Sequence, residues 1–185
     1  MTSDRERMLA GRPYSPYVDE LAEARARCRG LCERFNLIPF ANGAQRHALL
    51  AELLGTVGEG AEVMAPFHCD YGPQIHIGPR SFINYGAIVL DAAEVRIGAD
   101  VQIGPSVQLI TALHPLDAAE RRRGTETAAP VVIEDGAWLA TGVIVLPGVT
   151  VGADTVVGAG SVVTRDLPPG MLCVGNPCRP IRPAG

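Results

Sequence analysis

A six-residue repeat between Ile133 and Asp166 restricts this chain to very few folds. An aliphatic residue returns there at every sixth position, at Ile133, Leu139, Val145, Val151, Val157 and Val163. Small or β-branched residues sit four positions after five of these, at Ala137, Val143, Val149, Thr155 and Ser161. Neither a helix nor an alternating strand has this period. A short fixed period is typical of a solenoid, whose units bury their apolar residues by stacking on their neighbours.

Each repeat is predicted to be a very short strand followed by a tight turn. In the unit from Val151 to Val156, Gly152 and Asp154 suit the turn, and Val151 points into the core. Three such units would close one triangular coil. The repeat therefore predicts a mainly β fold, a parallel β-helix.

The repeat extends upstream, with two interruptions. Aliphatic residues six apart recur at Ile77, Ile83 and Val89, and again at Ile97, Ile103 and Leu109. The step from Val89 to Ile97 is eight residues, which indicates a locally expanded coil. From Leu109 to Ile133 there are 24 residues, but residues 113–129 lack the pattern. We expect a loop that leaves the solenoid there and rejoins it in register.

Helices are predicted before the solenoid. Residues 4–10 form a short amphipathic segment, residues 44–54 a further helix, and the segment between them has one apolar face surrounded by arginines at positions 25, 27, 29 and 34. We interpret these arginines as a solvated face. The expected organisation is a helical cap over residues 1–56, a β-helix over 57–170 with a loop excursion at about 110–132, and a tail over 171–185.

Charge and composition exclude several classes of function. The net charge of −4 and the pI of about 5.5 argue against nucleic acid as the main partner. No apolar run is long enough to span a membrane, and residues 1–7 are too charged for a secretory signal, so we expect a cytoplasmic protein. Cys28 and Cys32 would share a helix face, but no CxxC or His pair completes a metal site. We therefore expect reduced, packed thiols and no metal.

Several motifs together resemble the maltose and galactoside O-acetyltransferases of the hexapeptide-repeat superfamily, over essentially the whole chain. They are Met8-Leu9-Ala10-Gly11, Cys69-Asp70-Tyr71-Gly72, Asn84, Leu90-Asp91, Thr111-Ala112-Leu113-His114-Pro115, Trp138, residues 158–164 and Gly175-Asn176-Pro177. The resemblance implies a left-handed parallel β-helix that assembles as a homotrimer with active sites between subunits. It also implies acetyl-CoA as the donor, a sugar hydroxyl as the acceptor, and direct transfer without an acyl-enzyme.

His114 is the expected general base. An alcohol attacks a thioester poorly while it is protonated, and an imidazole is the side chain best matched to remove that proton near neutral pH. His114 lies in the extruded loop, where Pro115 restricts its backbone. By family position, Asn84 stabilises the oxyanion, and a backbone N–H near Thr141 is a second donor.

The resemblance also assigns binding residues. Asp70 falls at an acceptor contact, with Tyr71 beside it; Asp91 either contacts sugar hydroxyls or orients His114, and Glu126 is another candidate for that orientation. Trp138 lines the cleft or packs at the subunit interface. The residues carried over to the CoA groove are Thr141, Ala159, Thr164, Arg165, Arg179 and Arg182.

This sequence departs from the family pattern at a few positions, and proteins of this fold also have other functions. The Asp that contacts the acceptor in the family is displaced to Asp19 in this sequence. Pro16 stands at one family contact, and Ala92 replaces a polar contact. These departures leave the identity of the acceptor sugar undetermined. A xenobiotic or amino-sugar acceptor is the main alternative. A non-catalytic scaffold is another. A zinc enzyme of the γ-carbonic anhydrase type would need three His ligands, and the four histidines of this chain do not show that spacing.

Overall fold

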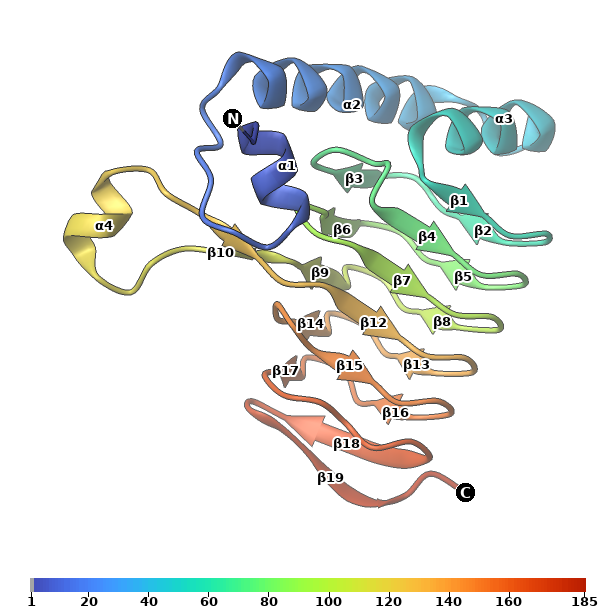
Figure 1. The fold of residues 1–185 in the computed structure, drawn as a ribbon. Coiled ribbons are helices and arrows are strands. Elements are labelled where there is room, and N and C mark those ends of the chain that lie inside the picture. Colours follow the sequence, from blue (N-terminus) through green and yellow to red (C-terminus); the bar gives the residue numbers. More distant parts are fainter. Residues whose placement is uncertain (1) are drawn as a thin grey trace.

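The computed structural model describes residues 2–185. Its body is a stack of coils in which each turn of the chain adds one short strand to each of three sheets, and the helices Asp19–Leu37 and Gly43–Leu53 lie over the first coil (Figure 1). Strands on neighbouring coils pair in parallel, from β1 with β4 through β14 with β17. The parallel β-helix expected from the repeat is therefore confirmed.

The strands of each sheet follow one another down the stack. The first sheet contains β1 (Thr56–Val57), β4 (Ile75–Ile77), β7 (Val95–Ile97), β12 (Val131–Ile133) and β15 (Thr150–Val151). The second contains β2 (Glu62–Val63), β5 (Phe82–Ile83), β8 (Gln102–Ile103), β13 (Trp138–Leu139), β16 (Val156–Val157), β18 (Met171–Gly175) and β19 (Cys178–Pro183). The third contains β3 (Phe67–Cys69), β6 (Ala87–Leu90), β9 (Gln108–Ile110), β14 (Ile144–Val145) and β17 (Val162–Val163).

The repeated aliphatic residues form three inward columns, one for each sheet. In the first sheet Ile97 pairs with Ile133 and Ile133 with Val151, so identical positions of successive coils stack. All six residues of the repeat between Ile133 and Val163 have no exposed surface. Complete burial of an aliphatic side chain stabilises the folded state by about 1.5 to 3 kcal/mol. The six-residue repeat of the sequence thus corresponds to the spacing, along the chain, of the side chains that form the core.

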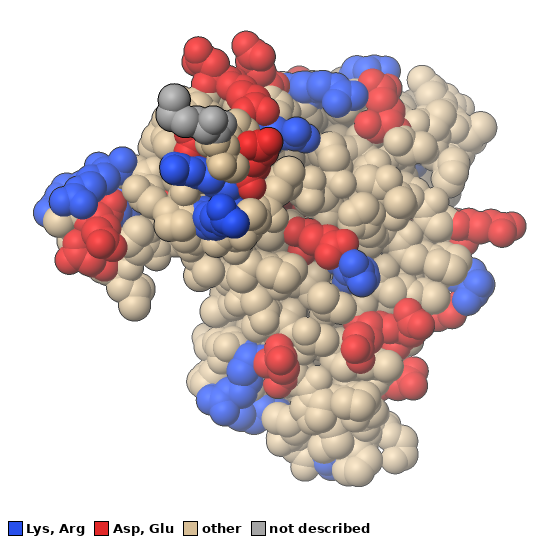
Figure 2. All heavy atoms as spheres, in the orientation of Figure 1, with Lys and Arg blue, Asp and Glu red and all other residues tan. Residues whose placement is uncertain are grey.

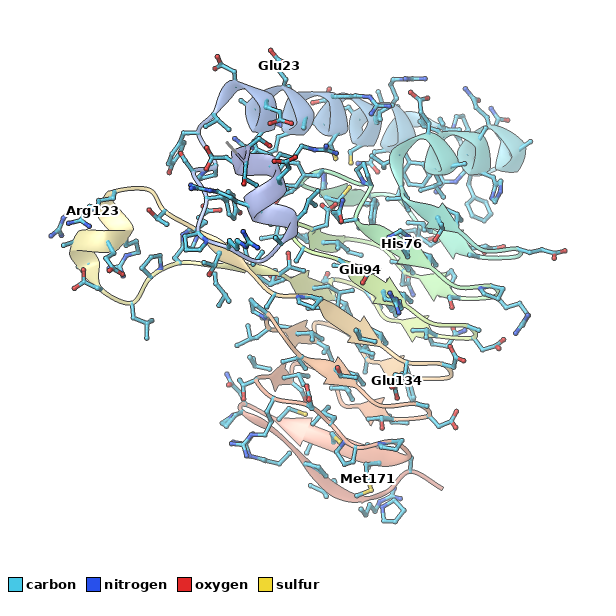
Figure 3. The ribbon with its side chains drawn as sticks, viewed as in Figure 1. Glu23, His76, Glu94, Arg123, Glu134 and Met171 are labelled. Atoms are coloured by element: carbon cyan, nitrogen blue, oxygen red, sulfur yellow. The ribbon has the colours of Figure 1, made fainter. Side chains whose placement is uncertain are left out.

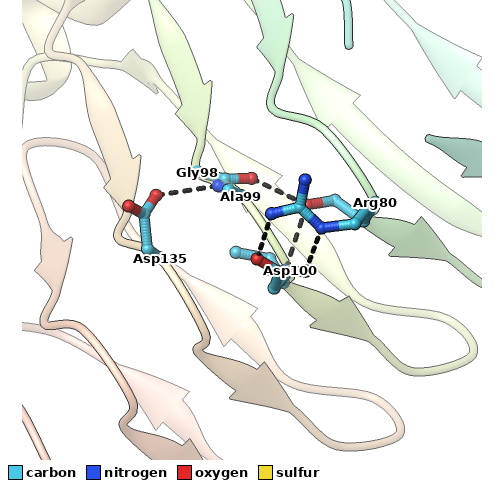
Figure 4. A network of polar contacts seen from close by, with 7 residues as sticks. Arg80, Gly98, Ala99, Asp100 and Asp135 are labelled. Atoms are coloured by element: carbon cyan, nitrogen blue, oxygen red, sulfur yellow. Dashed lines mark hydrogen bonds and ion pairs between the residues drawn. The ribbon is translucent and has the colours of Figure 1, made fainter. Parts of the chain in front are cut away.

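The first corner, where the first sheet turns into the second, is held by polar contacts between coils (Figure 4). The Arg80 guanidinium donates to both carboxylate oxygens of Asp100, at 2.7 and 2.6 Å, and the Ala99 N–H donates to Asp135 Oδ1 at 2.8 Å. Arg80 and Asp100 have φ angles of 57° and 58°, in the left-handed region. These two neighbouring coils therefore each turn through a strained residue, and the ion pair between the two residues helps to hold them.

Two glycine substitutions test this packing. A Cβ on Gly98 would lie 2.7 Å from the Asp135 backbone N and closer still to Asp135 Oδ1, whereas a Cβ on Gly30, inside a helix, meets nothing within 4 Å. We expect Gly98→Ala to lower the free energy of unfolding by about 1 to 3 kcal/mol. Gly30→Ala, the matched control, raises it by about 0.5 to 1 kcal/mol because it removes backbone freedom from the unfolded chain. Urea unfolding measures both, and a neutral Gly98→Ala would contradict the tight corner.

The N-terminal cap consists of α1 (Asp4–Leu9), α2 (Asp19–Leu37) and α3 (Gly43–Leu53). The Asn36 side chain of α2 donates to the Phe67 carbonyl at 3.0 Å and accepts from the Phe67 N–H at 2.9 Å. These are the backbone groups of β3 that a preceding coil would otherwise pair, so the cap closes an open sheet edge. Among residues 2–185, no helix is long and apolar enough to cross a membrane.

The excursion leaves the third sheet after β9 and projects from the side of the stack (Figure 1). It contains β10 (Ala112–Leu113), α4 (Ala118–Arg122) and β11 (Thr127–Ala128), with β10 and β11 paired antiparallel. The chain then returns at β12, where Val131 pairs with Val95. The excursion therefore rejoins the stack in register. Charged side chains of both signs gather over it, as Figure 2 shows.

Candidate active site

The third corner, between the third sheet and the first sheet of the next coil, is expanded in three successive coils. Inward residues are eight apart from Cys69 to Ile77 and from Val89 to Ile97, and 24 apart from Leu109 to Ile133. Lower in the stack, Val145 to Val151 takes the regular six. Extra backbone at this corner carries polar residues that the core does not need. The candidate site lies here, on the expanded side of the solenoid.

His114 and Glu126 face each other across the excursion. The Nδ1 atom of His114 lies 3.7 Å from Oε1 of Glu126, and the other carboxylate oxygen accepts from the Tyr14 hydroxyl at 2.8 Å. The Glu126 side chain is 17% exposed and that of His114 is 59% exposed. Burial and the Glu126 carboxylate raise the pKa of Tyr14, which keeps its hydroxyl protonated as the donor. The exposed imidazole thus lies beside a carboxylate that is sheltered from solvent.

Two further contacts fix the backbone around this pair. Tyr14 and Glu126 exchange backbone hydrogen bonds in both directions, each 3.0 Å long. Arg121 donates to the carbonyls of Pro115 and Leu116, at 2.9 and 3.1 Å. The loop that carries His114 is therefore tied both to the N-terminal segment and to its own helix α4.

Asp91 organises the turn above the excursion. Its side chain is fully buried and accepts from the backbone N–H groups of Asp70 at 3.0 Å, Tyr71 at 2.9 Å and Gly72 at 2.7 Å. Burial raises the pKa of Asp91 to about 6, although the N–H groups of Tyr71 and Gly72 act to lower it. With both oxygens already engaged, Asp91 is placed to shape the Asp70–Gly72 turn. This geometry favours a positioning role over direct contact with an acceptor.

A polar pocket of about 240 Å³ opens beside these groups, and we call it the corner pocket. It is lined by Tyr14, Pro16, Tyr17, Arg25, Asp70, Tyr71, Ala92, Ala112 and Glu126. Burial raises the pKa of Asp70, and the nearby Arg25 guanidinium opposes that shift. The structure brings Asp70, Tyr71 and Glu126 together in one wall. Pro16 and Ala92, which depart from the family pattern, line the same space.

Arg25 is a pocket residue that sequence reasoning missed. It donates to the Tyr71 hydroxyl at 2.7 Å and to the Pro16 carbonyl at 2.6 Å. Its interpretation as part of a solvated helix face was therefore wrong. A signal was present, because Arg25 lies four residues after Leu21 and three before Cys28, on the face that those two residues bury.

Asn84 lies at a different corner from His114. It follows β5 at the second corner, between the second and third sheets, and its Oδ1 accepts from the Tyr85 N–H at 2.8 Å. Thr141 and Ala159 occupy the same corner on lower coils. Within one chain, the structure does not bring Asn84 and His114 together.

The remaining candidates lie on the lower coils. Trp138, half exposed, lies on β13, while Thr164 and Arg165 follow β17. Arg179 and Arg182 lie on β19, the last strand of the hairpin. These positions share the lower half of the stack with Thr141 and Ala159, away from the corner pocket.

The other histidines lie outside the site. His76 Nε2 is 3.9 Å from Glu94 Oε1 on the first sheet, where Figure 3 labels both residues, and His76 Nδ1 is 3.1 Å from the Thr56 hydroxyl. His68 is on β3 and His47 on α3. Among residues 2–185, no three histidines gather into one metal-binding group.

The stacked coils and the expanded corner define the class of hexapeptide-repeat transferases. The family model for the bacterial transferase hexapeptide (six repeats) matches residues 130–165. The model for the maltose acetyltransferase hexapeptide capping motif matches residues 7–58, which contain most of the helical cap.

Similarity to solved structures identifies the family within this class to which the chain belongs. The chain is 42% identical to a maltose O-acetyltransferase from Clostridium difficile 630, with a TM-score of 0.96 over 98% of this chain and 97% of that one. A hexapeptide-repeat acetyltransferase from Vibrio cholerae, solved with acetyl-CoA, is 40% identical, with a TM-score of 0.91 over 98% of each chain. A galactoside acetyltransferase solved with coenzyme A is 37% identical, with a TM-score of 0.93 over 97% of this chain and 90% of that one. The chain belongs to the maltose and galactoside O-acetyltransferase family, and it is an acetyltransferase.

Proposed function

We propose that this enzyme transfers the acetyl group of acetyl-CoA to a hydroxyl of a sugar, with His114 as the general base. The observation that carries the proposal is the arrangement of Tyr14, Glu126 and His114 at the corner pocket. The 2.8 Å hydrogen bond from Tyr14 fixes Glu126, and Glu126 in turn lies 3.7 Å from His114 Nδ1. His114 does not itself line the corner pocket, but it lies beside Glu126, which does, and an imidazole in this place is suited to take a proton from a bound hydroxyl.

In the proposed reaction, Glu126 holds the proton on His114 Nδ1 and leaves Nε2 as the proton acceptor. As Nε2 takes the hydroxyl proton, the acceptor oxygen attacks the thioester carbon directly, with no acyl-enzyme. The tetrahedral intermediate carries an oxyanion, which Asn84 and a backbone N–H near Thr141 stabilise. When the C–S bond breaks, His114 returns the proton to the CoA sulfur.

The lining of the corner pocket supports a sugar as acceptor. Asp70 and Glu126 accept hydrogen bonds, Arg25 donates them, and the hydroxyl of Tyr71 does both. Such a mixture suits the many hydroxyls of a carbohydrate better than an apolar acceptor. Asp91 acts on the acceptor indirectly, by holding the Asp70–Gly72 turn.

We also propose that the enzyme is a homotrimer whose sites form between subunits. Asn84 lies at a different corner from His114, so a second subunit would complete the site. Large apolar side chains near these corners support such an interface, because Tyr85 is 53% exposed, Trp138 50% and Leu116 98%. The neighbouring subunit's surface would bury them.

The CoA groove is proposed along the lower coils, formed by Thr141, Ala159, Thr164, Arg165, Arg179 and Arg182. The two arginines of β19 and Arg165 supply the positive charge that the CoA phosphates need. The solved relatives with acetyl-CoA and coenzyme A support this donor. A cytoplasmic location accords with this donor and with five free cysteines.

Thiol release from acetyl-CoA tests the proposed function. The purified enzyme is offered a panel of mono- and disaccharides, amino sugars and aminoglycosides, each with the donor in excess. We expect release that depends on a sugar hydroxyl, with an acetyl ester as the product by mass spectrometry. An N-acetyl product would favour the amino-sugar or xenobiotic alternative. Absence of release with every acceptor would favour a non-catalytic scaffold.

A further inference from the structure

Three cysteine thiols meet under the helical cap, and we call them the thiol cluster. Cys28 and Cys32 lie one turn apart on α2, and Cys69 ends β3. The Sγ atom of Cys69 is 3.5 Å from that of Cys28 and 3.7 Å from that of Cys32, and all three lie within 4.8 Å of one another. Within residues 2–185 this is the only such group of three or more His, Cys, Asp or Glu side chains.

These separations are those of a thiolate metal site. In a tetrahedral zinc site with Zn–S bonds of about 2.3 Å, neighbouring sulfur atoms lie about 3.8 Å apart. The distances from Cys69 Sγ to Cys28 Sγ and to Cys32 Sγ are within a few tenths of an ångström of that value. Two ligands from one helix turn and a third from a strand would form one face of a tetrahedron. An ion could therefore bind with little movement of the backbone.

The cluster can be reached from solvent. A pocket of about 330 Å³ is lined by Cys32 and Cys69 together with Arg25, Arg29, Glu33, His68 and Asp70. Hydrogen bonds among the three thiols lower the pKa of Cys32 and raise the pKa of Cys28 and of Cys69, so a single negative charge is shared within the cluster before an ion binds. An ion entering through the pocket would find a fourth coordination position open to water.

We propose that Cys28, Cys32 and Cys69 form a three-thiolate site for a thiophilic d¹⁰ metal ion, with zinc as the ion that the separations fit best. On binding, the three thiols release their protons to solvent, three metal–sulfur bonds form, and water completes the tetrahedron. The site joins α2 to β3 and so fastens the cap to the first coil. It differs from a carbonic anhydrase site, which would use histidines, and it does not depend on the proposed acetyl transfer.

Cadmium provides a direct probe, because its thiolate complexes absorb in the ultraviolet. Metal-free protein, reduced and then freed of reductant, is titrated with Cd²⁺ alone and, in parallel, with Zn²⁺ alone. We expect one ion of either metal per chain, a thiolate-to-cadmium charge-transfer band, and slower reaction of Cys69, the partly exposed cysteine of the cluster, with a thiol reagent. We also expect the melting temperature to rise with either ion.

Variants separate the cluster from other binding. Cys69→Ser and Cys32→Ser should lose the band and the thermal shift, while Cys173→Ser, which changes a buried cysteine outside the cluster, should keep both. Circular dichroism establishes which variants fold, and two separate cluster variants keep the test independent of either one. A wild-type protein that binds no ion overturns the proposal. Equally, unchanged binding in a folded Cys69→Ser variant overturns it.

Discussion

Replacing His114 by alanine should lower kcat for acetyl transfer by about 10²- to 10⁴-fold, the usual contribution of a general base. Without the imidazole, the acceptor hydroxyl must lose its proton to water. Because the His114 side chain is largely exposed, we expect the fold to be unchanged. KM for acetyl-CoA should change little, since the proposed donor groove lies on the lower coils.

His76→Ala is the matched control for this prediction. His76 also lies near a glutamate, 3.9 Å from Glu94, but on the first sheet and outside the corner pocket. Its replacement should leave kcat at the wild-type value. Steady-state kinetics with the best acceptor, followed over pH, measures both variants. If His114→Ala retained wild-type kcat and its pH profile, another group would have to be the base.

Asn84→Ala should reduce kcat by about 10²- to 10³-fold, as expected for the loss of one oxyanion donor. Asn84 is partly exposed, and its side chain accepts only the N–H of the next residue, so the change should cost little stability. Ser106, at the same corner one coil lower, provides a control, and Ser106→Ala should leave kcat unchanged. Loss of binding without loss of kcat would assign Asn84 to substrate contact instead.

The two variants together test where the site forms. If His114 of one subunit meets Asn84 of its neighbour, then mixed trimers of His114→Ala and Asn84→Ala chains contain some sites with both residues intact. In each mixed trimer one of the three sites keeps both residues, so the isolated mixed trimers should show about a third of wild-type activity. Co-expression with two different affinity tags isolates the mixed trimers. No recovery would indicate a site within one chain.

The solenoid could be predicted from the sequence because its core repeats with the chain. Each inward residue, such as Leu139 or Val157, meets the equivalent residue of the next coil, so local periodicity reports directly on long-range packing. The excursion could also be predicted, since the residues after it resume the period. The eight-residue step at Cys69 to Ile77 was not recognised, although it equals the one identified at Val89 to Ile97.

The candidate site was harder to predict because its contacts join residues far apart in the chain. Tyr14 and Glu126 are 112 positions apart, and Arg25 and Tyr71 are 46 apart. Periodicity carries no information on such pairs. The contacts of Cys69 with Cys28 and Cys32 also join residues far apart in the chain. The sequence spacing indicates only that Cys28 and Cys32 share a helix face.

The expanded third corner has an evolutionary consequence. At the excursion, 24 positions separate the inward residues Leu109 and Ile133, where a regular unit has six. Strand β12 nevertheless pairs with β7 in the regular register. Loops of very different length can therefore be exchanged at this corner without disturbing the ladder of hydrogen bonds that keeps the chain folded. Mutation can thus explore new acceptors on one edge of the protein, while the inherited scaffold and its donor side stay the same.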